Sequence, residues 1–380
     1  MFGPVNAYPV FMSSRVLVVG TGAIGGTVVG GLAKSGVDVV GLSSNTAIAE
    51  AVSAHGYRRR FQETEETTHA PIVTDPAPLE GAFDWIVLAT PPDAVALAAS
   101  STAHALSEGG AFVVMQNGLC EDRVAKALAE KGLADSVLGA IVGFGASMPE
   151  PGLFERTSEG GFTLGRMDGS EDPRLAALAE LLAPVGECEM AENFAGARWS
   201  KLAINCAIST LGTLAGERLG RVLRHKLARR LALEIMTEAV AIASAEGVAL
   251  EKVSGTLDLD WIALTHDERR HRGSVGLVAK HTLLLAVGAR YRKLRSSMLA
   301  ALERGRTPPV DFINGEIVSR GEPYGIDTPV NQVATRMVHE LASGARKPDM
   351  ANIEELAQQT DRRHSTQPPS RKPRRPTGGA

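Results

Sequence analysis

A glycine-rich stretch near the start of the chain constrains the fold more than any other feature. Residues 15–19 form an apolar run, RVLVV, and three glycines follow within the next six residues before a second apolar run begins. This pattern predicts a strand, a tight turn and a helix N-terminus. Gly20 permits the turn, Gly22 lets backbone N–H groups approach a pyrophosphate, and Gly25 lets the helix pack on the strand. We therefore expect a dinucleotide to bind at Gly20, Thr21, Gly22, Ala23, Ile24 and Gly25.

The residues after the second expected strand bear on which dinucleotide binds. Many NAD-binding folds have Asp or Glu about 20 residues beyond the glycines, where the carboxylate binds both ribose hydroxyls. This chain instead has Ser43, Ser44 and Asn45. Because hydroxyl and amide groups can donate hydrogen bonds to a 2′-phosphate, the segment favours NADP over NAD, with Ser43 and Ser44 as contacts. Three arginines at 58–60 lie too far along for this task, and we expect them in an exposed hairpin.

The first half of the chain alternates strands and helices, which predicts a parallel α/β sheet. We expect helices over 24–35 and 93–106 and strands over 37–42, 85–89 and 111–115. Two glycine-rich β-type runs, 137–144 and 162–164, are expected to close the same sheet, and a domain boundary is expected near Glu189. Ligands bind beyond the carboxyl ends of such strands. The segments 90–92 and 116–119 are therefore candidate contacts for the nicotinamide, although an Asn-Gly pair after a strand also makes an ordinary turn.

Composition and charge restrict the kind of protein. The chain has 380 residues, 44% of them hydrophobic and 22% charged, which is typical of a globular protein with room for two domains. Its net charge of -3 includes a tail, 361–380, with six basic residues and one acid, so the rest of the chain carries -8. An acidic body argues against nucleic acid as the main partner, and the proline-rich tail is expected to be disordered.

The cysteines and apolar segments indicate the cellular setting. Cys120, Cys188 and Cys206 are odd in number and form no Cys-x-x-Cys pair, so we expect neither a disulfide framework nor a zinc site. The segment before Arg15 lacks a basic stretch followed by a long apolar one, and no apolar run reaches the ~18 residues of a membrane span. We therefore expect a cytoplasmic protein that is neither secreted nor inserted in a membrane.

The second half is almost continuously helical. Helices are expected over 195–214, 218–245, 257–270, 275–304, 311–321 and 331–342. The predicted organisation is an NADP-binding domain over 14–189, a helical substrate domain over 193–345 and the tail over 361–380. Long helices in the second domain make a homodimer plausible. His281 is expected to be a core or surface helical residue, and no histidine spacing indicates a metal site.

Three polar residues share one face of the first of these helices. Lys201, Asn205 and Ser209 recur at i, i+4 and i+8 on an otherwise apolar helix. They could form an interhelical hydrogen-bonded cluster or a snorkelling lysine. Alternatively, the face points into a crevice between the domains, where a lysine ammonium can protonate a carbonyl oxygen. A later serine pair, 296–297, could be only a helix end and a new start.

Together these stretches resemble the ketopantoate reductase (2-dehydropantoate 2-reductase) family from Arg15 to about Ser343. The resemblance rests on GTGAIG at 20–25, QNGL at 116–119, WSKLAIN at 199–205, SSML at 296–299, DFING at 311–315 and TPVN at 328–331. It implies an α/β Rossmann-type N-terminal domain that binds NADPH, followed by an all-α C-terminal domain, a 6-phosphogluconate-dehydrogenase-like arrangement. It also implies Lys201 as general acid, with Asn117, Asn205 and Ser297 orienting cofactor and substrate.

The chain also departs from the family pattern at residues that choose the substrate. The family glutamate ahead of the Asp-x-Ile-Asn-Gly segment falls on Pro309, and Asp311, two residues on, cannot simply replace it. The lysine that is usual at the end of the fourth strand is missing from 90–92, a helix asparagine becomes Ser209, and the stretch 257–291 is longer than usual. Hydride chemistry survives these changes better than ketopantoate specificity does.

The sequence therefore predicts an NADPH-dependent reductase that converts a 2-oxo acid to a 2-hydroxy acid, with 2-dehydropantoate, the substrate in pantothenate biosynthesis, as the first compound to test. Lys201 would be the catalytic acid, and Asn117, Asn205 and Ser297 would bind the substrate. Two alternatives remain open. One is an enzyme of the same family that reduces a different carbonyl or an imine, which Pro309 favours. The other is a non-catalytic dinucleotide-binding redox sensor.

Overall fold

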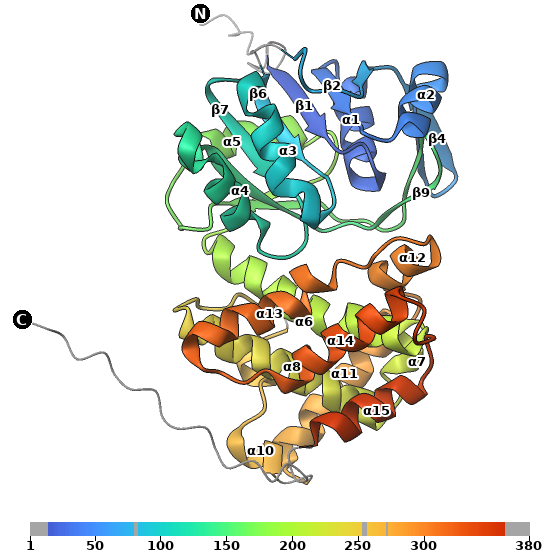
Figure 1. Cartoon of the computed structure of the whole chain (residues 1–380), viewed down its shortest axis with the longest axis vertical. Helices are drawn as coiled ribbons and strands as arrows, with labels where there is room; N and C mark the ends of the chain where they lie inside the picture. Colours follow the sequence, from blue (N-terminus) through green and yellow to red (C-terminus); the bar gives the residue numbers. More distant parts are fainter. Residues whose placement is uncertain (1–13, 80–82, 253–256, 271–272, 362–380) are drawn as a thin grey trace, which may run out of the picture. The chain divides into compact units, whose positions relative to one another are not determined.

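The computed structural model describes residues 14–79, 83–252, 257–270 and 273–361. The chain divides into two compact units, residues 1–198 and 199–380. The first unit is an α/β domain and the second is helical, as the sequence predicted (Figure 1). The division falls inside α6 (Phe194–Ala215), further along the chain than the boundary expected near Glu189. The expected disordered tail lies, apart from Asp361, outside the described residues.

The first unit is built on an eight-stranded sheet with the order β12-β11-β8-β7-β6-β1-β2-β5. Its strands are β1 (Arg15–Val19), β2 (Asp38–Leu42), β5 (Ile72–Val73), β6 (Phe83–Leu88), β7 (Leu106–Val114), β8 (Val137–Val142), β11 (Phe162–Gly165) and β12 (Cys188–Met190). All neighbouring strands pair in parallel except β8 and β11. The strand order reverses between β1 and β6, which is where such sheets bind their ligands.

The sheet forms because its strands are continuous apolar runs that can be buried on both faces. Val16, Val18, Val87 and Val113 are completely buried in one core with the helices. The helices of this unit are α1 (Ala23–Lys34), α2 (Thr46–His55), α3 (Val95–Thr102), α4 (Cys120–Leu128) and α5 (Arg174–Leu182), with short 3-10 turns η2 (Pro92–Ala94), η3 (Ala103–Ala105), η4 (Ala129–Lys131) and η5 (Ala134–Ser136). The expected helix over 93–106 is therefore only α3 between two 3-10 turns, because β7 already begins at Leu106.

A second, four-stranded sheet has the order β4-β3-β10-β9. It comprises β3 (Tyr57–Phe61), β4 (Thr64–Thr68), β9 (Ala146–Glu150) and β10 (Leu153–Arg156). The predicted arginine hairpin is confirmed as β3 and β4, although its arginines are half-buried rather than fully exposed. Arg59 packs against Gly30 of α1 and pairs with Glu66 at 3.0 Å.

The second unit contains only helices and short turns among its described residues. They are the rest of α6, α7 (Leu219–Val222), α8 (Lys226–Ala245), α9 (Leu259–Ile262), α10 (His266–Arg270), α11 (Val275–Arg290), α12 (Ser297–Glu303), η6 (Val310–Phe312), α13 (Asn314–Gly321), η7 (Glu322–Tyr324), α14 (Pro329–Ala342) and α15 (Ala351–Thr360). No helix of the described part is both long and apolar enough to cross a membrane.

The expectation of one continuous helix over 218–245 and another over 275–304 is wrong, because each range contains two helices separated by a break. The first break follows α7, where the Arg229 guanidinium satisfies the carbonyls of Leu223 and Arg224 that a continuous helix would have used. The second follows α11, where the Ser296 hydroxyl accepts the N–H of Leu299 and so starts α12. Serine favours this capping position because its side chain competes with the helix backbone. The expected helix over 257–270 is likewise two short ones, and α15 was not expected.

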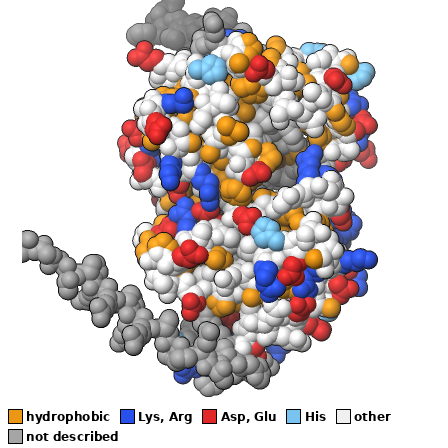
Figure 2. Space-filling view, viewed as in Figure 1, with side chains coloured by type: hydrophobic (Ala, Val, Ile, Leu, Met, Phe, Trp, Pro, Cys, Tyr) orange, Lys and Arg blue, Asp and Glu red, His pale blue; other side chains and the backbone are white. Residues whose placement is uncertain are grey.

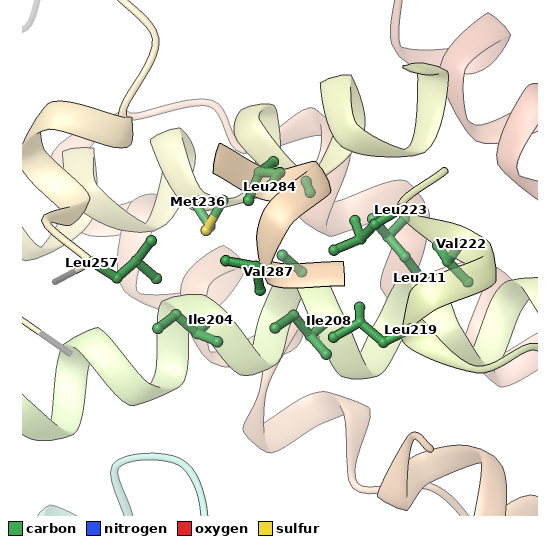
Figure 3. A pocket seen from close by; sticks show the side chains of 12 residues that line it. Ile204, Ile208, Leu211, Leu219, Val222, Leu223, Met236, Leu257, Leu284 and Val287 are labelled. Carbon is green, nitrogen blue, oxygen red and sulfur yellow. The ribbon is translucent and has the colours of Figure 1, made fainter. Parts of the chain in front are cut away.

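The apolar face of α6 points into the helical unit (Figure 3). Ile204, Ile208 and Leu211 line a small cavity of about 20 Å³ together with residues of α7, α8 and α11. A cavity of this size is close to one water molecule, and its apolar lining offers no partner for one. Asn205 and Ser209 each follow an inward isoleucine by one residue, a rotation of about 100° around the helix. The polar stripe of α6 therefore lies on a different face from the core.

Candidate functional site

The glycine turn after β1 has the geometry that its sequence predicts. Gly20 has φ 93°, and a Cβ there would come within 2.7 Å of the Thr90 nitrogen. A Cβ on Gly25 would overlap the carbonyl oxygen of Gly20, so only glycine lets α1 pack against the turn. A Cβ on Gly22 would meet nothing within 4 Å, so the turn faces open space at the start of α1. These features fit a pyrophosphate approaching the N–H groups of a helix N-terminus.

Unpartnered polar atoms gather at the same edge of the sheet. The hydroxyls of Thr21 and Tyr57 are buried without a hydrogen-bond partner within the described chain, and so is the Oε1 atom of Gln116. The Tyr57 hydroxyl fills the space that a Cβ on Gly41 would occupy, next to Thr21. Burial raises the pKa of Tyr57 well above its usual value, so its phenol stays protonated and can donate a hydrogen bond. Buried polar groups without partners are uncommon, and these ones fit a polar ligand at the edge.

The end of β2 holds the serines expected to contact the adenosine ribose. Ser43 is buried, with its hydroxyl 3.3 Å from the Asn45 nitrogen, and Ser44 is exposed. The side chain of Asn45 caps α2 by accepting the N–H groups of Ala47 and Ile48. The asparagine side chain is thus used for the fold, and the Ser43 hydroxyl also donates to the Asn45 carbonyl oxygen at 3.4 Å, so the Ser44 hydroxyl is the exposed serine group of this segment.

The ends of β6 and β7 are tied together by Gln116. Its Nε2 atom donates to the carbonyl oxygen of Thr90 at 3.0 Å. The next residue, Asn117, is exposed, and Gly118 has φ 96°, a conformation that favours glycine. The 116–119 segment is thus a turn after a strand whose asparagine side chain is available at the carboxyl edge of the sheet.

A buried ion pair that sequence reasoning missed holds this segment. Arg198 is 1% exposed, pairs with Glu121, and donates to the carbonyl oxygens of Gln116 at 3.0 Å and Val114 at 3.2 Å. Burial raises the pKa of the Glu121 carboxyl, and the charge of Arg198 opposes that shift. An arginine just before Trp199 on an apolar helix was the available signal. Arg198 therefore fixes the backbone that leads from the end of β7 to Asn117.

In the second unit, the polar stripe of α6 is anchored by a buried asparagine. Lys201, Asn205 and Ser209 are half-buried. Asn314, completely buried at the start of α13, donates to the carbonyl oxygen of Cys206 at 3.1 Å and accepts the hydroxyl of Thr210. The DFING motif is thus bound to the helix that carries Lys201 and Asn205.

The two serines of the SSML motif have different positions. Ser296 is buried, and its hydroxyl donates to the carbonyl oxygen of Ser209 at 2.7 Å and lies 2.8 Å from the Thr213 hydroxyl. Ser297 is exposed on the first turn of α12. The start of α12 is therefore held against α6 by Ser296. The sequence alone did not distinguish this structural role of Ser296 from the binding role expected of Ser297.

The segment around Pro309 carries no replacement for the family glutamate. Pro309 is half-buried and precedes η6, and Asp311 is exposed within that turn. The Oδ1 atom of Asp311 lies 2.8 Å from Nε2 of His339, so this carboxylate already has a partner. Among the described residues no group of His, Cys, Asp and Glu side chains is suited to hold a metal ion.

Comparisons with known proteins identify the family to which both units belong. Residues 16–169 match the family described as "Ketopantoate reductase PanE/ApbA", and residues 193–342 match "Ketopantoate reductase PanE/ApbA C terminal". The chain is 28% identical over 326 residues to the 2-dehydropantoate 2-reductase of Halobacterium salinarum, covering 85% of this chain and 97% of that protein.

Two solved structures share the fold along nearly their whole length. The PanE/ApbA family ketopantoate reductase from Ralstonia eutropha JMP134 gives a TM-score of 0.71 at 25% identity, covering 87% of this chain and 99% of that one. D-mandelate dehydrogenase, solved with NADH and anilino(oxo)acetate, gives 0.72 at 19% identity with the same coverage. At 19% identity, the likeness to D-mandelate dehydrogenase shows a shared fold and nothing more. Since the two family matches together span most of the chain, this protein is an oxidoreductase of the ketopantoate reductase PanE/ApbA family.

Proposed function

We propose that this protein reduces a 2-oxo acid to a 2-hydroxy acid with NADPH, and that 2-dehydropantoate is the first substrate to test. The observation that carries the proposal is the stripe of α6 on which Lys201 and Asn205 are half-buried, held by Asn314. A positioned ammonium beside an amide is suited to a carbonyl oxygen that gains negative charge. This activity would belong to pantothenate biosynthesis in the cytoplasm.

The first unit is proposed to hold the cofactor. The turn from Gly20 to Gly25 would bind the pyrophosphate, Ser43 and Ser44 would bind the adenosine ribose with its 2′-phosphate, and Asn117 would orient the nicotinamide. When bound, NADPH supplies a hydride to the carbonyl carbon. The open space at Gly22 and the absence of a carboxylate at the end of β2 support this assignment.

The second unit is proposed to supply the acid and the substrate contacts. The Lys201 ammonium would donate its proton to the substrate oxygen, and the amine would regain a proton from solvent. Asn205 would orient the carbonyl group together with Asn117, and the exposed hydroxyl of Ser297 would bind the carboxylate. These roles leave the fold's own hydrogen bonds intact, because Ser296 and Asn314 hold the helices in place.

Pro309 favours a second candidate, an oxo acid other than 2-dehydropantoate. A proline ring at the position of the family glutamate removes an acceptor for a hydroxylated substrate and offers an apolar surface. A 2-oxo acid with an apolar or aromatic body would suit this change. D-mandelate dehydrogenase, a structural relative, is named for an aromatic 2-hydroxy acid, which is the reduced counterpart of such an oxo acid, and was solved with NADH.

The deciding experiment is the oxidation of NADPH and NADH over a panel of 2-dehydropantoate, aliphatic and aromatic 2-oxo acids, and cyclic imines. We expect turnover with a 2-oxo acid and a higher kcat/KM with NADPH than with NADH. Turnover confined to imines would overturn the oxo-acid assignment. Binding of NADPH without turnover on any compound would instead support the redox sensor.

A further inference from the structure

The helical unit contains a cavity that none of the proposed reaction residues line. Its volume is about 410 Å³, and it is lined by side chains of α8, α10, α11, α14 and α15. Figure 1 shows α10 and α15 at the same end of this unit. Cavities that hold small organic molecules span about 300–1,000 Å³, so this one has the size of a ligand site.

Positive charge predominates at the cavity. Among the described residues that line it, four side chains are cationic and three are carboxylates, namely Lys226, Arg230, Arg269 and Arg270 against Glu234, Glu238 and Asp361. Glu234 is neutralised by Arg230, and Glu238 accepts the backbone N–H groups of Val330 and Asn331, each at 3.0 Å. Within the part of the chain that the structure describes, Lys226, Arg269 and Arg270 are exposed and form no ion pair. An anionic group would therefore be attracted to this side of the cavity.

Most of the remaining lining is apolar, apart from Thr360 and His281. Leu231, Leu277 and Val330 are almost completely buried and face the cavity, and Ala357 of α15 is half-buried beside them. An inorganic ion would leave this apolar surface in contact with water, whereas a hydrocarbon body would cover it and so gain free energy by removing it from water. The lining thus selects an anion that carries an apolar body.

A histidine with an unused ring nitrogen completes the site. Nδ1 of His281 is buried and has no hydrogen-bond partner among the described residues. Burial and the neighbouring charges of Arg229, Lys226 and Arg230 lower the pKa of His281 to about 4. The ring is therefore neutral at pH 7, and Nδ1 can donate to or accept from a ligand, depending on its tautomer. A bound anion would favour the protonated ring and raise this pKa.

We propose that the cavity between α8, α11 and α15 is a binding site for an organic anion with one acidic group and an apolar body. The acidic group lies among Lys226, Arg269 and Arg270, and the body lies against Leu231, Leu277 and Val330. The site is separate from the residues assigned to the reduction, so its occupancy does not depend on the identity of the oxo acid.

Calorimetric titration of the full chain with octanoate tests the proposal. The wild type should bind octanoate, whereas the double variant Arg269→Glu/Arg270→Glu should bind it at least tenfold more weakly. Lys347→Glu is the matched control, because it reverses an exposed charge elsewhere in the same unit and should leave the affinity unchanged. The neutral 1-octanol and inorganic phosphate should each bind more weakly than octanoate.

Two further measurements separate this cavity from any carboxylate site at the reaction centre. Octanoate should bind Lys201→Ala as it binds the wild type, and its binding should raise the His281 pKa from about 4, as followed by NMR of the ring protons. Ala357→Trp should fill the cavity and block binding without removing a charge. Equal affinity in the Arg269/Arg270 variant, equal binding of 1-octanol, or loss of binding in Lys201→Ala would each overturn the proposal.

Discussion

At the scale of single residues, Lys201 carries the chemistry that the proposed function needs. Replacing it with alanine removes the proton donor but leaves the glycine turn untouched. We expect kcat for the oxo acid to fall by about 10²–10⁴-fold, as is typical when a general acid is lost. Stopped-flow NADPH oxidation measures this fall, and fluorescence titration should show unchanged NADPH affinity. Lys347→Ala is the control for the loss of a lysine elsewhere in the unit. A Lys201→Ala enzyme with normal turnover would refute the mechanism.

The neighbouring serines 296 and 297 should respond differently to the same substitution. Ser296→Ala removes a buried helix cap and the hydrogen bond to Ser209, so the free energy of unfolding should fall by about 1–2 kcal/mol. Ser297→Ala changes an exposed hydroxyl, so stability should stay within about 0.5 kcal/mol while KM for the oxo acid rises. Urea unfolding and steady-state kinetics measure both effects. A stability loss in Ser297→Ala, or an unchanged KM, would contradict the division of roles.

Arg198 shows why some site residues escape sequence reasoning. Its three partners, Val114, Gln116 and Glu121, lie 77 to 84 residues away along the chain. Nothing local in the sequence connects a helix arginine to a turn after a distant strand. Removing one member of such a buried ion pair typically costs about 3–5 kcal/mol, because the other charge is left without a partner.

At the scale of elements, the glycine turn and α1 offer a matched pair of substitutions. A methyl group on Gly22 would enter open space, so Gly22→Ala should fold normally but bind NADPH more weakly, since the methyl occupies the region facing the phosphates. Gly25→Ala would force the methyl into the Gly20 carbonyl oxygen and should destabilise the domain itself. Thermal unfolding and NADPH titration distinguish these outcomes. Undiminished NADPH affinity in Gly22→Ala would place the pyrophosphate elsewhere.

The packing of α11 on α8 should make stability depend on pH through His281. Its pKa of about 4 in the folded chain lies below the value of about 6.5 expected when unfolded, so the unfolded chain binds more protons between these limits. The free energy of unfolding should therefore fall as the pH drops from about 6.5 to 4. In His281→Asn this part of the fall should vanish, as judged by urea unfolding at each pH. His225→Asn controls for the substitution, and parallel curves for His281→Asn and the wild type would contradict the assignment.

At the scale of the whole molecule, cofactor binding should stabilise the folded chain by mass action. At a free concentration of 100 times Kd, a ligand that binds only the folded state adds about 2.7 kcal/mol to the free energy of unfolding. We expect NADPH to raise Tm more than NADH does at equal concentration, because no carboxylate at Ser43 or Ser44 repels a 2′-phosphate. Differential scanning fluorimetry measures the two shifts. A larger shift with NADH would reverse the proposed cofactor preference.

The fold could be predicted in outline because its signals are local. Apolar strands, the glycine turn and helical periodicity are each visible within about 20 residues, and they gave the α/β unit, the helical unit and the arginine hairpin. The breaks after α7 and α11 could not be seen, because they depend on Arg229 reaching carbonyls of the preceding turn and on Ser296 docking on Ser209. The candidate residues came from motifs, whereas Tyr57 and Arg198 act through contacts between distant segments, and so does the Asn314 side chain, whose partners the DFING motif does not reveal.

The surface of the molecule carries charges of both signs. Figure 2 shows acidic and basic side chains interspersed on the face in view. Many surface charges are paired, including Arg60 with Glu65 at 2.8 Å and Arg336 with Glu340 at 2.6 Å. Exposed pairs of this kind contribute little to stability, so the cores of the two units, rather than the surface charges, hold the fold.

The short stretch from Pro309 to Asn314 contains one residue that can be substituted without breaking a side-chain hydrogen bond and one that cannot. Asn314 is bound to α6 and, through Asn331, to α14, so almost any substitution there would disturb both helices. Pro309 is half-buried, and its side chain can form no hydrogen bond that its loss would break. Within six residues, the position proposed to meet the substrate can therefore change while the anchor stays fixed. A substitution at Pro309 should therefore change substrate preference while leaving the helical unit folded.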